Sequence, residues 1–196
     1  QFPPFVTNQF ELGVKLDLGF VGATLSAFQI TLPQSYTDLA TSTFVTNGQQ
    51  RNQGLEFIAF GEPLPGLRLL GGFTLLNAIL TNTQGGLTNG NQAVGTTPFQ
   101  FSTGLDWDTP WVKGLGVLGR VVYNGQVYLN PQNTQAAPPW TRIDAGLRYT
   151  FERADGKPVS LRANVINLFD ANYWIATTRD ASRETAGFNF SSAAHC

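Results

Sequence analysis

The sequence predicts an all-β protein, built as one antiparallel sheet of about eight strands, and three observations support this fold class. Apolar and polar side chains alternate with a period of two in eight blocks of about ten residues, and no convincing helical period is found. Short connections rich in Gly, Pro and Asp alternate with long polar connections. Only 13% of the 196 residues are charged, which is about half the share in ordinary soluble domains.

The expected strands follow one another along the whole chain. Five blocks carry the alternation, the third less cleanly than the others: residues 9–18, 99–107, 115–123, 142–151 and 159–167. Three further blocks are weaker: residues 23–32, 52–60 and 67–78. The block 23–32 is expected to change face part-way, because Leu25 and Phe28 have opposite parity.

The connections indicate which kind of sheet this is. The short ones are residues 19–22, 61–66, 108–114 and 152–158, and the long ones are 33–51, 79–98, 124–139 and the polar segment after residue 170. Strands of this length, joined alternately by short periplasmic turns and long extracellular loops, are typical of an antiparallel transmembrane β-barrel. In lipid every backbone N–H and C=O must pair internally, so strands span a membrane only in a closed barrel.

Alternation alone leaves two orientations open. A membrane barrel places its apolar face toward lipid, whereas a soluble all-β carrier of small ligands turns the apolar face inward. The low charge and the unequal loops favour the membrane barrel. Aromatic residues at block ends, such as Phe99, Trp107, Tyr149 and Phe151, are expected in interfacial girdles.

Composition excludes several functions. The formal net charge is 12 − 13 = −1, so no electrostatic case exists for binding nucleic acid. The single cysteine and the single histidine are the last two residues, Cys196 and His195, so we expect no disulfide framework, no multi-cysteine zinc site and no histidine-based catalysis. No catalytic, cofactor-binding or metal-ligating residue is assigned. Because the chain opens at Gln1 and contains no methionine, we expect a fragment of a longer protein.

Several motifs, taken in order, resemble a known family. Val159–Asp170 (VSLRANVINLFD), followed by Asn172-Tyr173-Trp174, resembles the end of the penultimate strand of TonB-dependent outer-membrane receptors. The segments QFELGVK at 9–15, QRNQGLE at 50–56, GFT at 72–74 and WTRIDAG at 140–146 are similar to strands of the same family. The resemblance covers residues from about 5 to 175 and fits the second half of the ferric-siderophore branch.

This resemblance implies a C-terminal portion, residues 1–196, of a roughly 22-stranded receptor barrel in the outer membrane of a Gram-negative bacterium. The plug domain and the TonB box would be absent, and the assignment is uncertain after about residue 175. The implied partners are outer-membrane lipid, a ferric siderophore as transported ligand, and the TonB complex only through the absent N-terminal part. Two alternatives stay open: a complete eight-stranded outer-membrane barrel with a structural or adhesive role, and the soluble carrier.

Two sets of side chains are candidates for function. Polar-face residues expected toward the barrel lumen are Glu11, Lys15, Glu56, Arg68, Asp106, Arg120, Arg142, Asp144, Arg148 and Arg162. Asp144 and Arg162, on neighbouring expected strands, are the expected ion pair. Candidates for ligand contact in the long loops are Tyr36, Arg51, Gln126, Tyr128, Tyr173, Trp174 and Arg179, because aromatic faces and arginine suit planar anionic chelates.

Overall fold

One antiparallel sheet of eight strands makes up most of the molecule. The computed structural model describes residues 5–38, 41–175 and 191–192. The sheet strands are β1 (Asn8–Asp17), β2 (Val21–Asp38), β3 (Thr43–Leu64), β4 (Leu67–Asn82), β5 (Phe99–Asp108), β6 (Leu115–Asn124), β9 (Trp140–Glu152) and β10 (Pro158–Val165). The remaining elements are short: the 3-10 turn η1 (Gln84–Gly86) and the two-residue strands β7 (Val127–Tyr128), β8 (Ala136–Ala137), β11 (Trp174–Ile175) and β12 (Ser191–Ser192).

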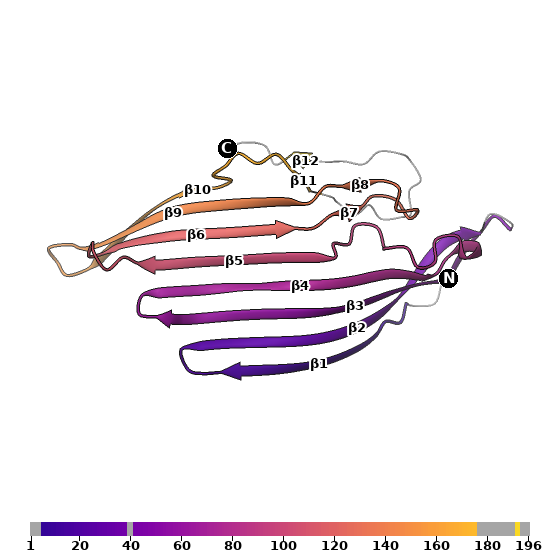
Figure 1. Cartoon of the computed structure of the whole chain (residues 1–196), viewed down its shortest axis with the longest axis horizontal. Helices are drawn as coiled ribbons and strands as arrows, with labels where there is room; N and C mark the ends of the chain where they lie inside the picture. The colour runs from indigo at the N-terminus through magenta and orange to yellow at the C-terminus, as the bar shows by residue number, and fades with distance from the viewer. Residues whose placement is uncertain (1–4, 39–40, 176–190, 193–196) are drawn as a thin grey trace.

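Each sheet strand pairs with its nearest sheet neighbours in the sequence. The order is β1-β2-β3-β4-β5-β6-β9-β10, and β7 pairs with β8 in a small hairpin between β6 and β9. Within the described residues the sheet is open, with β1 and β10 at its two edges (Figure 1). The sequence therefore predicted both the class and the number of the main strands.

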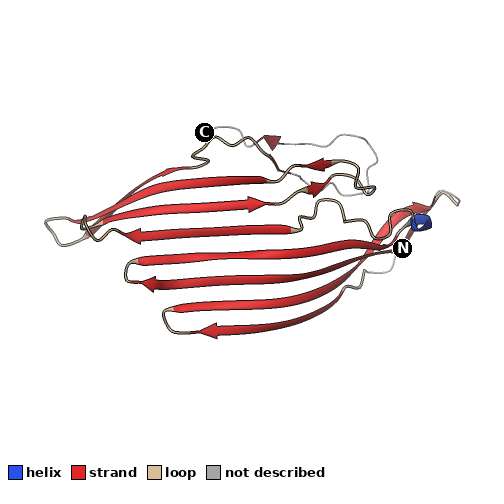
Figure 2. Ribbon diagram, viewed as in Figure 1, coloured by secondary structure: helices blue, strands red, loops and turns tan. Residues whose placement is uncertain are grey.

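The connections divide between the two ends of the sheet. All four short turns lie at one end, and the long connections lie at the other (Figures 1 and 2). Glycine is required in these turns: Gly114 has a φ of 84°, and a Cβ there would lie within 2.1 Å of the Thr150 carbonyl oxygen. We call the two ends the short-turn end and the long-loop end.

The first expected long loop is mostly strand, which corrects the sequence-based boundaries. β2, β3 and β4 have 18, 22 and 16 residues rather than about ten, so the predicted loop 33–51 is a paired extension of β2 and β3. Polar composition suggested a loop, but the amide side chains bond across the strands: Gln34 donates to Gln50 at 3.0 Å and Gln53 to Gln29 at 2.6 Å. A strand that continues past an apolar region into water can be wholly polar and still pair.

The pairing register gathers the alternating apolar side chains on one face. A single row across the sheet contains Val14, Leu25, Phe57, Phe73, Phe101 and Tyr123. On this face the rings of Phe57, Phe73, Phe99 and Tyr123 follow one another at centroid distances of 5.5, 6.2 and 5.7 Å. We call this the apolar face and the opposite one the polar face.

The expected change of face in β2 does not occur. The β2–β3 register is unbroken from Val21 to Gln34, so Leu25 lies on the apolar face and Phe28 on the polar face. Phe28 is accommodated by the glycine opposite it, because a Cβ at Gly54 would lie 2.6 Å from the Phe28 ring. Phe60 likewise covers Gly22 on the polar face. Its place at the end of the block 52–60 had predicted a position in an interfacial girdle instead.

No layer of the described residues covers the apolar face. Leu12 is 78% exposed and Leu161 is 60% exposed, while the buried apolar residues among those described are only Ala78, Ala93, Val127, Ala137 and Tyr173. Contiguous apolar patches of this extent are rare on monomeric soluble proteins, so the face requires an apolar surrounding. No helix in the described ranges is both long and apolar enough to cross a membrane.

The two faces of β5 provide a test of this orientation. Leu105 is on the apolar face, opposite Leu69 and Gly119, and Ser102 is on the polar face. Leu105→Arg should lower the free energy of unfolding in lipid vesicles by ~2–4 kcal/mol, because it places a charge in hydrocarbon near the bilayer midplane. Ser102→Arg faces water and should cost much less. Equal losses for the two variants in urea titrations would contradict the orientation.

Candidate functional site: the polar face and the long-loop end

The ten charged residues predicted for the polar face all lie on that face in the pairing register. They are Glu11, Lys15, Glu56, Arg68, Asp106, Arg120, Arg142, Asp144, Arg148 and Arg162. The face divides into a charge cluster near the short-turn end, an ion pair under the turn that follows β10, and residues with no ion pair among those described.

The charge cluster contains two arginines and two aspartates. The Arg68 Nη2 atom lies 3.2 Å from an Asp106 carboxylate oxygen and 2.9 Å from an Asp108 oxygen. The Arg148 Nη2 atom lies 2.8 Å from Asp106 and also bonds Asp108. Each carboxylate therefore meets both guanidinium groups, and the four side chains tie β4, β5 and β9 together.

A glycine makes this cluster possible. β6 runs between β5 and β9, and its residue opposite both Asp108 and Arg148 is Gly116. A Cβ at Gly116 would lie 2.7 Å from the Arg148 Nη2 atom, so the guanidinium crosses β6 through the space that a side chain would fill. Sequence reasoning left Asp108 and Gly116 out of the candidate set, although Asp108 is two residues from Asp106 and so shares its face.

The second ion pair corrects the expected partner of Asp144. Asp144 lies 3.0 Å from the Nε atom of Arg142 on the same strand and face, not beside Arg162. Arg162 lies opposite Arg148 in the β9–β10 register, four residues along β9 from Asp144. The expectation identified the neighbouring strands correctly but had no means of fixing their register.

The turn after β10 folds back onto this ion pair. The Asn167 backbone N–H donates to Asp144 at 2.9 Å, and the Leu168 N–H donates to the Ile143 carbonyl at 2.7 Å. The Asn167 side chain then holds Ala171 through two hydrogen bonds of 3.1 and 3.0 Å. Asn167 has a φ of 58°, a left-handed conformation that asparagine tolerates better than most residues.

The long connections at the other end form an ordered unit. Gln92 and Asn133 exchange two hydrogen bonds, of 2.8 and 2.9 Å, and the Gly95 N–H donates to the Tyr128 carbonyl at 3.1 Å. Ala93, Val127 and Ala137 are buried within it. Because these hydrogen bonds join the two segments, we call residues 83–98 and 125–139 the paired loops.

The predicted ligand-contact residues are dispersed over this end. Tyr36 lies in β2 and Arg51 in β3, not in loops, whereas exposed Gln126 and half-buried Tyr128 belong to the paired loops. Tyr173 is 9% exposed and stacks on Trp140 at 4.4 Å, and Trp174 is exposed in β11. Arg179 lies outside the described residues. Of the described candidates, Gln126 and Tyr128 lie in the paired loops, and the Tyr173 ring packs on Trp140.

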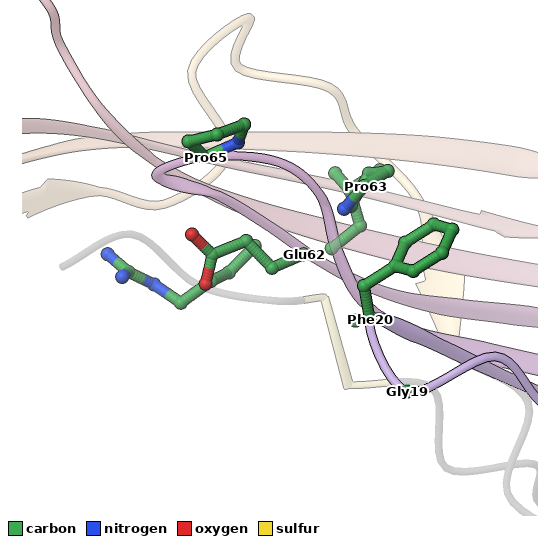
Figure 3. A pocket seen from close by; sticks show the side chains of 8 residues that line it. Gly19, Phe20, Glu62, Pro63 and Pro65 are labelled. Carbon is green, nitrogen blue, oxygen red and sulfur yellow. The ribbon is translucent and has the colours of Figure 1, made fainter.

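Two hollows lie against charged side chains of the polar face and the short turns. One of about 930 Å³ lies at the short-turn end, between the turns after β1 and β3, and is lined by Phe20, Glu62, Pro63 and Arg68 among others (Figure 3). Its one carboxylate, that of Glu62, accepts a hydrogen bond from the Gly66 backbone and so closes its own turn. The other, of about 460 Å³, lies beside the charge cluster and is lined by residues that include Arg120, Asp144 and Leu118. Arg120 is exposed there.

An open antiparallel sheet with one uncovered apolar face, one charged face, short turns at one end and long loops at the other defines a length of transmembrane β-barrel wall. Residues 1–168 match the family described as TonB dependent receptor-like, beta-barrel. The chain therefore belongs to the TonB-dependent receptors, as the motifs predicted, and is an outer-membrane protein. Outer-membrane barrels have short periplasmic turns and long extracellular loops, which assigns the short-turn end to the periplasm and the long-loop end to the cell exterior.

Named relatives are receptors for iron or metal chelates. The chain is 42% identical over 175 residues to the ferrichrome receptor FcuA of Yersinia enterocolitica, a match covering 89% of this chain and 23% of that protein. It is 28% identical to the metal-pseudopaline receptor CntO of Pseudomonas aeruginosa, covering 88% of this chain and 25% of the relative. The chain thus spans about a quarter of the length of these curated relatives.

Solved structures agree in fold. The ferric preacinetobactin receptor BauA of Acinetobacter baumannii superposes with a TM-score of 0.84 at 40% identity, covering 98% of this chain and 28% of that one. The siderophore receptor PiuA of the same organism gives a TM-score of 0.76 at 25% identity, covering 86% and 25%.

The charge cluster should contribute to the stability of the wall. Arg148→Ala removes one of the two cations that meet both carboxylates, and the Arg148 side chain is only 14% exposed, compared with 45% for Arg68. The variant should lose about 1–3 kcal/mol of unfolding free energy, because two partly shielded carboxylates lose hydrogen bonds. Arg162→Ala is the matched control, since Arg162 has no ion pair among the described residues and should change stability by less than about 0.5 kcal/mol. Equal effects in urea titrations would refute a role for the cluster.

The paired loops should separate when Asn133 is replaced. Asn133→Ala removes both hydrogen bonds to Gln92 and puts alanine at a φ of 55°. Amide hydrogen exchange in residues 83–98 should become about tenfold faster, the effect of ~1.4 kcal/mol. The exposed neighbour Gln132 provides the control, because Gln132→Ala should leave the exchange unchanged. Unchanged exchange in Asn133→Ala would mean that each loop is held independently.

Proposed function

We propose that this chain is part of the barrel of an outer-membrane receptor that takes up a ferric siderophore in a TonB-dependent manner. The observation that carries the proposal is family membership together with 42% identity to a ferrichrome receptor. The similarity to a ferric preacinetobactin receptor over 98% of this chain supports the same ligand class. In this proposal the receptor transports its ligand unchanged and catalyses no reaction on it.

The two ends of the sheet would have different tasks. The paired loops are extracellular and cross-linked by hydrogen bonds, so Gln126 and Tyr128 are presented on a preorganised surface, which lowers the entropy cost of binding. An aromatic ring and an amide offer apolar contact and hydrogen bonds to a polar chelate. The ligand contacts would therefore lie at this end, among residues that include these two.

The polar face would line the path through the barrel. Arg68 and Arg148 are already neutralised by Asp106 and Asp108, and Arg142 by Asp144. Exposed Arg120 lines the hollow beside the charge cluster and has no ion pair among the described residues, so it would help to attract an anionic chelate as it passes. TonB would act through parts of the receptor outside this chain.

Uptake of labelled iron by the complete receptor tests this proposal. A strain lacking its own siderophore receptors, supplied with this one, should accumulate iron from at least one member of a panel that includes ferrichrome and ferric preacinetobactin. Tyr128→Ala should weaken binding of that ligand about tenfold, as expected for an aromatic contact that contributes ~1–2 kcal/mol. Gln132→Ala, in the same loop, should bind normally. Absence of uptake with every chelate, from a correctly inserted receptor, would overturn the proposal.

A further inference from the structure

Where the strand register is unbroken, the apolar face carries one charged side chain among the described residues. From β1 to β10, the positions that the unbroken register assigns to this face hold apolar, small or uncharged polar residues, except for Arg51. Its cross-strand neighbours are Thr31 on β2 and Ile79 on β4. An arginine on the lipid side of a membrane barrel needs a physical reason, because burying it in hydrocarbon is costly.

Arg51 lies just beyond the apolar region, toward the extracellular end. Along β3 the same-face residues are Phe57, Leu55, Gln53 and then Arg51. Gln53 shares its row with Gln29 and Asn77, and it donates to the Gln29 side chain at 2.6 Å. This amide row marks the upper border of the hydrocarbon-facing surface. The cost of an outward arginine is small at such a border and much larger at the midplane.

The guanidinium of Arg51 makes no ion pair with any of the described residues. Arg68 and Arg148 on the opposite face are each paired with two carboxylates. The surroundings at this height of the membrane are the headgroups of the outer leaflet, and arginine binds phosphate through two parallel N–H···O bonds.

We propose that Arg51, with the amide row Gln29–Gln53 below it, binds the phosphate of an anionic glycolipid in the outer leaflet. The guanidinium takes the phosphate, and the two amides face the sugar and acyl-amide groups between the phosphate and the chains. This surface points away from the ligand path, so the inference rests on the outer-membrane location and not on the identity of the siderophore.

Lipid retention by the complete receptor tests the proposal. The purified receptor would be titrated in detergent with diphosphorylated lipid A, and bound lipids counted by native mass spectrometry. Arg51→Gln keeps a polar side chain but removes the charge, and it should weaken lipid A binding about fivefold, the effect of ~1 kcal/mol for one basic residue at an anionic surface. Arg51→Lys should lose less, because it keeps the charge without the paired geometry.

Three controls make the result decisive. Arg162→Gln removes an arginine from the polar face and should leave lipid A binding unchanged, and dephosphorylated lipid A should bind wild type and Arg51→Gln alike. Heat-modifiable gel mobility checks that each variant is folded. Equal losses in Arg51→Gln and Arg162→Gln, or no loss in Arg51→Gln, would overturn the proposal. So would inorganic phosphate that binds as tightly as lipid A, since the site would then be one for free anions.

Discussion

The structure depends on one constraint, the pairing of backbone N–H and C=O groups where no water is available. Along β1 to β10 these groups are paired between neighbouring strands in an unbroken meander, which is the arrangement that hydrocarbon permits. The same constraint concerns the outer sides of β1 and β10, whose backbone groups have no sheet partner within the described residues. In a closed barrel, further strands pair with both edges of such a sheet. The chain spans about a quarter of the length of its relatives.

Pairing fixes the register, and the register decides which side chains meet. Asp106 faces Arg68 because β4 and β5 pair at that level, and Arg148 reaches the same carboxylates because Gly116 leaves β6 bare between them. Charged groups on the polar face can thus cross-link three strands, while the apolar face presents its side chains to hydrocarbon. A β-sheet with period-two alternation is well suited to separating these two environments.

The extracellular end follows different rules, since water is present there and polar strands can extend. β2 and β3 continue well past the apolar region with amide contacts such as Gln34 to Gln50, and the paired loops are held by Asn133 and Gln92. Two binding surfaces are proposed at this end and they point differently: Tyr128 belongs to the loops above the path, whereas Arg51 faces the lipid side. Because the two surfaces are separate, a substitution in one need not alter binding at the other.

The sequence by itself determined the fold class, the eight strands, the distribution of charged and apolar residues between two faces, and the family, because alternation and turn composition are local properties. It did not determine the lengths of β2 and β3, the partner of Asp144, the bridging role of Gly116 or the outward position of Arg51. These depend on which residue of one strand lies opposite which residue of the next, and strands far apart in sequence meet at a register that only the whole sheet decides. The loop candidates show the same division. Composition selected Tyr173 and Tyr128 alike, but tertiary packing buried the first against Trp140 and left the second half-exposed in the paired loops.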